Sequence, residues 1–273
     1  MEHYTYIKCY FLILFVLLWR KRIWFGGNSE RGEAVFFIDN PDLSIIVPTF
    51  REAQNIPILV REVSAAMEHV LPEWELIIVD DNSRDGTEDA CGSLRKQGFP
   101  LKLVVRKNER GLATAVLEGF TRARAPVFVV MDADLSHMPA AIPIFYQAIQ
   151  NGAEFVLGSR YIPGASTDDK WTVYRYLNSK IASLLARPLT SVSDPMSGYF
   201  ALPRSLLERC DELSPVGYKI GLEILIKCKP INLKEVPINF RTRVLGESKL
   251  SVKQQTLYLI HLWSLYRHKW TAG

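Results

Sequence analysis

Short apolar runs alternate with amphipathic segments between residues 44 and 160. The runs are rich in Val, Ile and Leu and lack polar–apolar alternation, which is typical of strands buried on both faces of a sheet. The segments between them carry apolar residues at helical spacing. Strands that alternate with helices predict a mainly parallel sheet with right-handed crossovers. The predicted strands are 44–47, 76–79, 101–105, 127–131 and 155–157, and the predicted helices are 56–70, 87–96, 111–123 and 140–150.

Two aspartates, Asp132 and Asp134, follow the fourth predicted strand directly. Because ligands bind outside the carboxyl ends of strands in open α/β sheets, we expect this pair at the ligand-binding edge. Neighbouring carboxylates repel one another, and a divalent cation held by one or two of them, together with substrate phosphates, removes that repulsion. An isolated Asp-x-Asp is more often a solvated turn. The buried strand before this pair and the motifs at other strand ends favour a metal site.

Two more clusters follow predicted strands, and the parallel arrangement brings them to the same edge. Pro48, where the first strand is predicted to stop, opens the segment that runs to Glu52, and Asp81 follows the second strand. Asp81 and Glu52 suit hydrogen bonding to ribose hydroxyls or base edges, and Phe50 suits contact with a base. These clusters predict a nucleotide site beside the metal.

The glycine motifs of the common nucleotide-binding folds are absent from the sequence. No Gly-x-Gly-x-x-Gly follows the first strand, which argues against a dinucleotide oxidoreductase, and no Gly-x4-Gly-Lys-Ser/Thr is present. Either Asp85 or Ser83 is expected to cap the next helix, with no part in chemistry. A nucleotide held by carboxylates and a metal, without a glycine phosphate loop, points to a nucleotide-sugar.

These motifs, in this order, match a known family. The chain resembles the family 2 glycosyltransferases of GT-A fold and, within them, the dolichol-phosphate (polyprenyl-phosphate) mannosyltransferases. The resemblance covers roughly residues 43–266. It rests on segments 46–52, 79–83, 131–137, 158–161, 194–200, 217–220 and 246–250. The chain departs from the family in having Phe50 and Arg51 where Tyr-Asn is frequent, and Ser136 where many relatives carry Gln.

The resemblance implies a role for each matching residue. The nucleoside pocket would be lined by Pro48, Phe50, Glu52, Val79 and Asp81. Asp132 and Asp134 would hold Mg²⁺ or Mn²⁺, and Ala133 would touch the nucleotide through its backbone. The phosphate contacts would be Arg160, Arg243 and Lys249, and the lipid phosphate would meet Arg175 and Ser179. Asp134, Arg160 and Arg175 are the implied catalytic residues.

The implied reaction transfers mannose from GDP-mannose to a polyprenyl (dolichyl) phosphate. The second pKa of a phosphate monoester is near 6, so the acceptor is already a dianion at neutral pH and needs no general base. The metal and Arg160 would stabilise the leaving nucleoside diphosphate. A single displacement at the anomeric carbon inverts it, giving a β-linked lipid sugar from an α-linked donor.

Both ends of the chain carry features of a membrane surface. Residues 10–19 form an apolar run followed by Arg20-Lys21-Arg22, which is too short for an ordinary spanning helix and fits a short anchor. An unstructured extension is the alternative. The predicted organisation is an anchor at 1–25, a linker at 26–42, a catalytic domain at 43–250 and a C-terminal amphipathic interface helix at 251–273. Within the catalytic domain, aromatic and basic residues interleave over 171–190, which indicates a second interface helix or a helix packed on the sheet.

The charge and the cysteines of the chain indicate what kind of surface it binds and in which compartment it lies. The net charge of +4 is mild, and basic residues gather near the two ends, which favours a membrane surface over nucleic acid. If the anchor spans, its basic flank keeps the catalytic domain on the cytoplasmic face, either of a bacterial inner membrane or of the endoplasmic reticulum. The four cysteines are scattered and include no Cys-x-x-Cys, so we expect reduced thiols.

Other functions fit parts of the pattern. The same chemistry with UDP-glucose or another donor stays open, because carboxylate spacing identifies neither base nor sugar. A non-catalytic membrane subunit of this fold is the alternative from a different class, and small membrane subunits are possible partners. The clustered charges argue against the subunit, since such charges are costly without a ligand. An oxidoreductase is the most distant alternative.

Overall fold

A seven-stranded sheet runs through the centre of the computed structural model, which describes residues 40–70, 73–167, 173–214, 216–241 and 252–271. The strand order is β3-β2-β1-β4-β7-β5-β8. All strands run parallel except β7, which is antiparallel to both of its neighbours. The strands are β1 (Leu43–Thr49), β2 (Trp74–Asp80), β3 (Leu101–Val105), β4 (Val127–Val130), β5 (Phe155–Ser159), β7 (Phe200–Pro203) and β8 (Leu233–Pro237).

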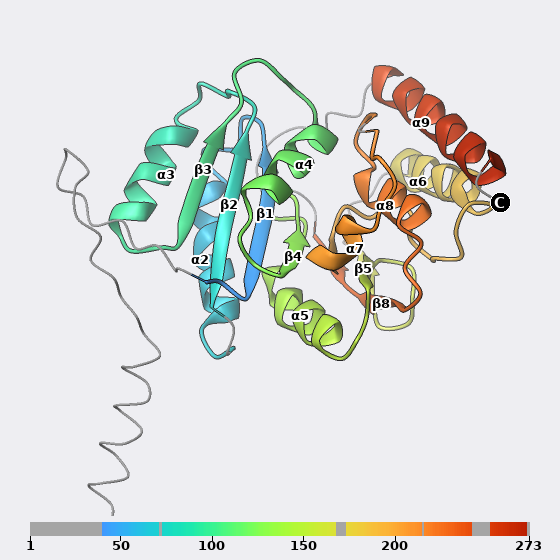
Figure 1. Ribbon diagram of the computed structural model, residues 1–273. Helices are drawn as coiled ribbons and strands as arrows, with labels where there is room; N and C mark the ends of the chain where they lie inside the picture. The colour runs from blue at the N-terminus through green and yellow to red at the C-terminus, as the bar shows by residue number, and fades with distance from the viewer. Residues whose placement is uncertain (1–39, 71–72, 168–172, 215, 242–251, 272–273) are drawn as a thin grey trace, which may run out of the picture.

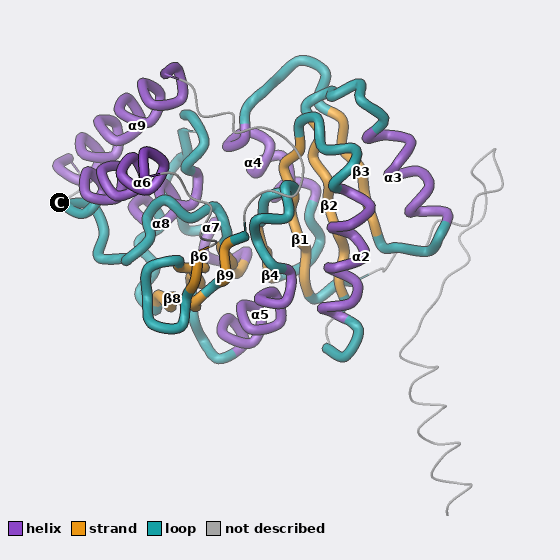
Figure 2. The backbone as a smooth tube through the Cα atoms, turned by 180° about the vertical axis from the view of Figure 1, so that it is seen from behind, coloured by secondary structure: helices purple, strands orange, loops and turns teal. Residues whose placement is uncertain are grey.

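Helices cover both faces of this sheet (Figures 1 and 2). One face packs against α2 (Ile56–Met67), α3 (Thr87–Lys96) and α5 (Ile142–Gln150), the last preceded by a 3-10 turn at Pro139–Ala141. The other face packs against α4 (Leu112–Arg122), α7 (Arg204–Glu208) and α8 (Ile220–Lys227). The mainly parallel α/β architecture predicted from the alternating pattern is confirmed.

Two helices lie side by side at one end of the molecule, α6 (Val173–Ala186) and α9 (Val252–Thr271) (Figures 1 and 2). The Tyr258 hydroxyl of α9 donates to the Ala182 carbonyl of α6 at 2.7 Å, and a buried cluster joins both helices to α8. The described part of the segment predicted as an interface helix therefore packs against α8 and α9. A short parallel pair, β6 (Ser166–Thr167) and β9 (Asn239–Phe240), completes the fold.

The sequence misplaced one strand boundary and did not reveal β7. The first strand was expected to stop at Pro48, yet β1 continues through it to Thr49. Proline is tolerated there because β4 pairs with β1 only as far as Ile46, so Pro48 lies beyond the pairing on that side. The β7 run is four residues long and falls outside the helix–strand alternation that guided the prediction.

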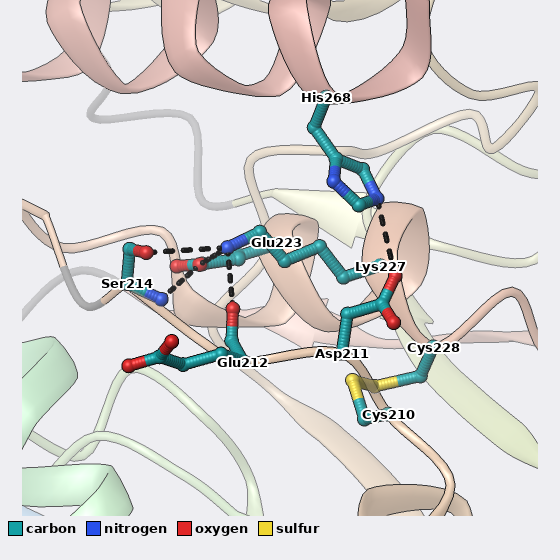
Figure 3. Close-up of a disulfide and its surroundings, with 8 residues drawn as sticks. All are labelled: Cys210, Asp211, Glu212, Ser214, Glu223, Lys227, Cys228 and His268. Carbon is teal, nitrogen blue, oxygen red and sulfur yellow. Dashed lines mark hydrogen bonds and ion pairs between the residues drawn. A yellow bond between two sulfur atoms is a disulfide. The ribbon is translucent and has the colours of Figure 1, made fainter. Parts of the chain in front are cut away.

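The expectation of reduced cysteines is wrong for one pair, because Cys210 and Cys228 form a disulfide. They lie 18 positions apart, with no local motif, and meet because the segment after α7 returns to the end of α8. Figure 3 shows the neighbouring charges: Lys227 forms a 2.8 Å ion pair with Glu223 and also donates to the Glu212 carbonyl at 2.7 Å. The α8 helix is thus fixed at its C-terminal end.

The predicted anchor and linker lie almost wholly outside the described residues, the first of which is residue 40. Within the described ranges, no helix has both the length and the hydropathy that a membrane crossing requires.

Candidate active site

The carboxyl ends of β1, β2, β4 and β5 meet at one edge of the sheet, as predicted. Because β7 runs in the opposite direction, its first residue, Phe200, pairs with Val130 at the end of β4. The segment before β7, residues 194–199, is thereby brought to the same edge. The topology therefore adds a loop to the site that a purely parallel sheet would have placed elsewhere.

The two aspartates after β4 lie at this edge in different environments. The side chain of Asp132 is 35% exposed, and its backbone N–H donates to Nδ1 of His137 at 3.0 Å. The carboxylate of Asp134 is buried and accepts the backbone N–H of Ser136 at 3.1 Å and its hydroxyl at 2.5 Å. Hydrogen bonds thus fix both ends of the turn that carries the two carboxylates.

His137 supports this turn from the protein interior. The ring is buried, stacks on Tyr199 at 4.9 Å and meets Phe240 edge-on at 5.5 Å. Since Nδ1 accepts a hydrogen bond, the proton resides on Nε2. Burial lowers the pKa of His137, and the carboxylates of Asp132 and Asp134 only partly oppose that shift. His137 is therefore a neutral support for the turn at physiological pH.

Gly198 leaves room beside Asp132. A Cβ at this position would lie 3.7 Å from both carboxylate oxygens of Asp132 and 3.8 Å from the His137 ring. Among the described residues, no group of three or more His, Cys, Asp and Glu side chains is arranged to hold a metal. Two carboxylates still suit Mg²⁺ or Mn²⁺, because substrate phosphates and water commonly complete the coordination. The donor set fits a metal that binds together with a nucleotide.

Arg160 follows β5 and lies against a buried carboxylate. Its Nε and Nη2 donate to the two oxygens of Asp194 at 2.7 and 2.8 Å, and its backbone N–H donates to the same side chain. Burial alone would lower the pKa of Arg160, but Asp194 outweighs that effect and raises it. The bidentate pair fixes the plane and charge of the guanidinium at the site.

The ends of β1 and β2 form the part of the edge expected to hold the nucleoside. The Phe50 ring lies within 4.9 Å of the Arg110 guanidinium and 5.2 Å of that of Arg51. Glu52 accepts a hydrogen bond from the Asn55 side chain at 2.6 Å. An aromatic ring flanked by cations, beside a carboxylate, suits a base and its phosphates.

Asp81 is already engaged by protein groups. It forms a buried ion pair with Arg106 and accepts the Gly111 N–H at 2.8 Å. Arg106 follows β3 and was missed, although its position after a strand resembles that of Arg160. Of the other residues expected to line the nucleoside pocket or touch the nucleotide, Pro48 is partly exposed, whereas Val79 and Ala133 are buried in the core.

The loops after the strands are tied together and strained. The Ser83 hydroxyl accepts the Arg51 N–H at 2.8 Å, and Asp85 accepts both the Ala53 N–H and the Thr87 N–H at the start of α3. The N-cap of α3 is Gly86 rather than either predicted residue; Asp85, one position earlier, accepts the first N–H of the helix, while Ser83 links two loops. Four non-glycine residues with positive φ fall in these loops: Arg51, Asn82, Arg84 and Leu135. Such conformations cost about 1–3 kcal/mol each and gather at functional sites.

The residues expected at the lipid phosphate are described in part. The Ser179 hydroxyl on α6 shares a 2.9 Å hydrogen bond with the Tyr161 hydroxyl, one residue after Arg160. Arg175 lies in α6, where the described side chains begin at Ser179. Arg243 and Lys249 lie outside the described residues.

Several residues at the edge escaped sequence reasoning. His137, Asp194 and Gly198 stood in matching segments without a role, and Lys219 stood in another. The Lys219 ammonium donates to the Met196 carbonyl in the loop before β7. His137 follows the aspartate pair by three residues, so its place in the sequence could have suggested it, whereas Asp194, Gly198 and Lys219 reach the edge only through the reversed β7.

The comparisons with known proteins agree with this geometry. Residues 44–210 match the family described as Glycosyl transferase family 2, which is more than half of the chain. The chain belongs to this family. The resemblance noted from the motifs is thereby confirmed, and so is its implication that the protein is a glycosyltransferase.

Three dolichol-phosphate mannosyltransferases resemble the chain over most of its length. A dolichol-phosphate mannosyltransferase of Saccharomyces cerevisiae is 42% identical over 85% of this chain and 90% of its own length. One from Mycosarcoma maydis is 42% identical over 84% of this chain and 80% of its own length. One from Pyrococcus furiosus is 40% identical over 82% of this chain and 64% of its own length.

Solved structures of the same fold include glucosyl-3-phosphoglycerate synthase from Mycobacterium tuberculosis. Its complex with Mn²⁺, UDP and glucosyl-3-phosphoglycerate has a TM-score of 0.59 and 18% identity, over 84% of this chain and 80% of that one. Its complex with Mg²⁺ and UDP has a TM-score of 0.58 and 17% identity, over 84% and 79%. The likeness confirms the GT-A fold expected from the sequence.

Proposed function

We propose that this protein transfers mannose from GDP-mannose to dolichyl phosphate or a closely related polyprenyl phosphate, with inversion at the anomeric carbon. The observation that carries the proposal is the Asp132–Asp134 turn at the sheet edge, beside Arg160 and the gap left by Gly198. The identity of about 40% to three dolichol-phosphate mannosyltransferases supports the choice of sugar and acceptor.

Asp132 and Asp134 are the proposed ligands of Mg²⁺ or Mn²⁺. When bound, the metal would supply positive charge to the donor diphosphate as it leaves. The structural neighbours with Mn²⁺ or Mg²⁺ and UDP share the fold and support this choice of cofactor. His137 keeps the turn in place through its bond to the Asp132 N–H, and Ser136 orients the Asp134 carboxylate.

The proposed roles of the remaining residues follow from their charge and position. Phe50 and Glu52 would hold the nucleoside, and Arg160, oriented by Asp194, would offset the charge of the donor diphosphate. Arg243 and Lys249 are proposed phosphate contacts, and Arg175 with Ser179 would meet the lipid phosphate. No side chain needs to take a proton from the acceptor, since a phosphate monoester is a dianion at neutral pH.

A membrane surface is the proposed location of the reaction, at the cytoplasmic face. Most of the large apolar side chains exposed among the described residues belong to α6 and α9. These are Ile181, Leu184, Leu185, Leu259, Ile260, Trp263 and Trp270. Exposed apolar residues with interleaved cations suit the boundary between lipid headgroups and acyl chains, where the acceptor phosphate lies.

Transfer of radiolabelled sugar to lipid tests the proposal. The full chain is incubated with dolichyl phosphate and, in parallel, with GDP-mannose, UDP-glucose or GDP-glucose, with Mn²⁺, Mg²⁺ or a chelator. Of the three donors, we expect only GDP-mannose to give a labelled lipid product, mannose linked to the lipid phosphate. We expect this product only when a divalent cation is present. Transfer from UDP-glucose but not from GDP-mannose would refute the donor, and full activity in the chelator would refute the metal.

A further inference from the structure

Lys219 is a cation at the site that, among the described residues, has no carboxylate partner. It is the residue before α8, and its ammonium donates to the Met196 carbonyl and lies 4.9 Å from the Tyr218 ring centroid. Among the residues that the structure describes, no carboxylate forms an ion pair with it. Lys227, at the other end of the same helix, differs because it pairs with Glu223 at 2.8 Å.

The surroundings make this charge costly to keep. Burial lowers the pKa of Lys219 to about 8, and the positive charge of Arg160 adds to that effect, while Asp132 and Asp194 oppose it. Arg160 is balanced by its bidentate bond to Asp194, whereas the contacts that Lys219 makes with described residues are to the Met196 carbonyl and the Tyr218 ring, both uncharged. A poorly solvated cation beside a phosphate-handling site is stabilised when an anion binds next to it.

The topology places Lys219 on the side of the site away from the nucleoside. In the strand order, β1 and β2 lie on one side of β4, and β7, against which α8 packs, lies on the other. Tyr218 packs against the cluster that includes Tyr258 and Leu262 of α9. A Cβ on Gly217 would lie 3.7 Å from that of Leu257, also on α9. Lys219 thus lies between the metal carboxylates and the helices with the exposed apolar residues.

We propose that the Lys219 ammonium binds the phosphate of the lipid acceptor. The inference rests on the proposed function. In the transfer, an oxygen of the acceptor phosphate forms the bond to the anomeric carbon while the bond from that carbon to the nucleoside diphosphate breaks. No proton changes hands, so Lys219 stays protonated and reduces the repulsion between the two phosphates throughout the step.

A purely structural role is the competing explanation, since Lys219 also holds the loop before β7 through Met196. Three variants separate the two roles. Lys219→Gln keeps a hydrogen-bond donor without the charge, Lys219→Arg keeps the charge, and Lys227→Gln removes a cation of the same helix that has a structural partner. For each, kcat and the KM for dolichyl phosphate and for GDP-mannose are measured together with the melting temperature.

We expect Lys219→Gln to raise the KM for dolichyl phosphate at least about 10-fold, the effect of losing a charged hydrogen bond, while the KM for GDP-mannose changes less than about 2-fold. Lys219→Arg should recover part of the loss, and Lys227→Gln should lower the melting temperature with both KM values near wild type. Equal rises in both KM values, or an unchanged KM for dolichyl phosphate, would overturn the inference. A wild-type enzyme inactive on dolichyl phosphate would instead overturn the proposed function.

Discussion

The carboxylates at the sheet edge differ in whether they already form an ion pair with an arginine. Asp81 already neutralises Arg106, and Asp194 neutralises Arg160, so both act by orienting cations. Asp132 is one third exposed, next to a glycine. The proposed metal ligands are therefore Asp132 and Asp134, whereas Asp81 and Asp194 neutralise and orient nearby arginines.

Replacing Asp134 by Asn tests the metal role at a single residue. The amide keeps the shape and a hydrogen-bond acceptor for Ser136 but loses the charge that binds a cation. We expect turnover to fall by more than the ~10–100-fold that loss of an outer-shell partner costs. Initial rates over a Mn²⁺ titration measure the effect, with the melting temperature as the control for folding. Wild-type rates at the same Mn²⁺ concentration would contradict the assignment.

Glu223 links pH to stability at one buried residue. Burial alone would raise the pKa of Glu223, but the His261 ring 3.3 Å from its carboxylate, the ion pair with Lys227 and the hydrogen bond from the Ser214 N–H outweigh it and lower the pKa. A carboxylate whose pKa is lowered by folding stabilises the fold at pH values above its usual pKa of 4.5. This contribution is lost as the pH falls through the pKa that the group has in the folded protein.

We expect the melting temperature to drop as the pH falls below about 4.5, and the drop to be smaller in Glu223→Gln. That variant should also melt at a lower temperature than wild type at neutral pH, because His261 and Lys227 lose their partner. Melting curves at a series of pH values give the comparison. Parallel pH profiles for the two proteins would show that another group controls acid unfolding.

Among the helices, α9 carries both side chains buried against its neighbours and large apolar side chains exposed to solvent. Its Tyr258, Leu262 and Leu265 are buried against α6 and α8, while Trp263 is 59% and Trp270 is 69% exposed. Such a division is expected of a helix that packs on its own protein and also lies on a bilayer. The α8 helix, which packs against α9, is flanked by Lys219 on one side and Cys228 on the other, and contacts of both residues fix its two ends.

Vesicle binding tests the role of the exposed tryptophans. We expect Trp263→Ser with Trp270→Ser to weaken partition of the full chain onto anionic vesicles by about 10-fold or more, since each ring is a large apolar surface. Ile231→Ser is the matched control, because Ile231 is 91% exposed but lies just before β8. Equal binding of the double variant and wild type in flotation assays would exclude α9 as the membrane contact.

For the molecule as a whole, helix–sheet packing depends on a close approach at Gly119. A Cβ there would lie 2.3 Å from Cγ2 of Ile46 on β1, so α4 can contact the sheet only without a side chain. Gly92 on α3 is the opposite case, because a Cβ added there would meet nothing within 4 Å.

Urea unfolding of two alanine variants checks this packing. Gly119→Ala should destabilise the protein by about 1–3 kcal/mol, the cost of overpacking a core. Gly92→Ala should stabilise it by about 0.5–1 kcal/mol, because alanine is the better helix former at an uncrowded position. A Gly119→Ala protein as stable as wild type would mean that α4 lies farther from the sheet.

The sequence predicted the half of the fold in which each strand is an uninterrupted apolar run. It located β1 to β5, α2 to α5 and the carboxylates after β4, because parallel strands bring such residues to one edge. It could not place Asp194, Gly198 or Lys219, since their position depends on the reversed β7, whose four residues carry no periodic signal. The disulfide was missed for a similar reason, because Cys210 and Cys228 meet only through tertiary packing.

The reversed strand also divides the chain into two consecutive blocks. Everything that would recognise the donor nucleoside lies before Asp134, and nearly everything that would meet the lipid lies after it, with β4 and β7 as the seam between them. Recombination near this seam could exchange the acceptor without altering the donor. A chimaera joined in the turn after β4, with a relative that uses another acceptor, would show whether the two specificities are inherited separately.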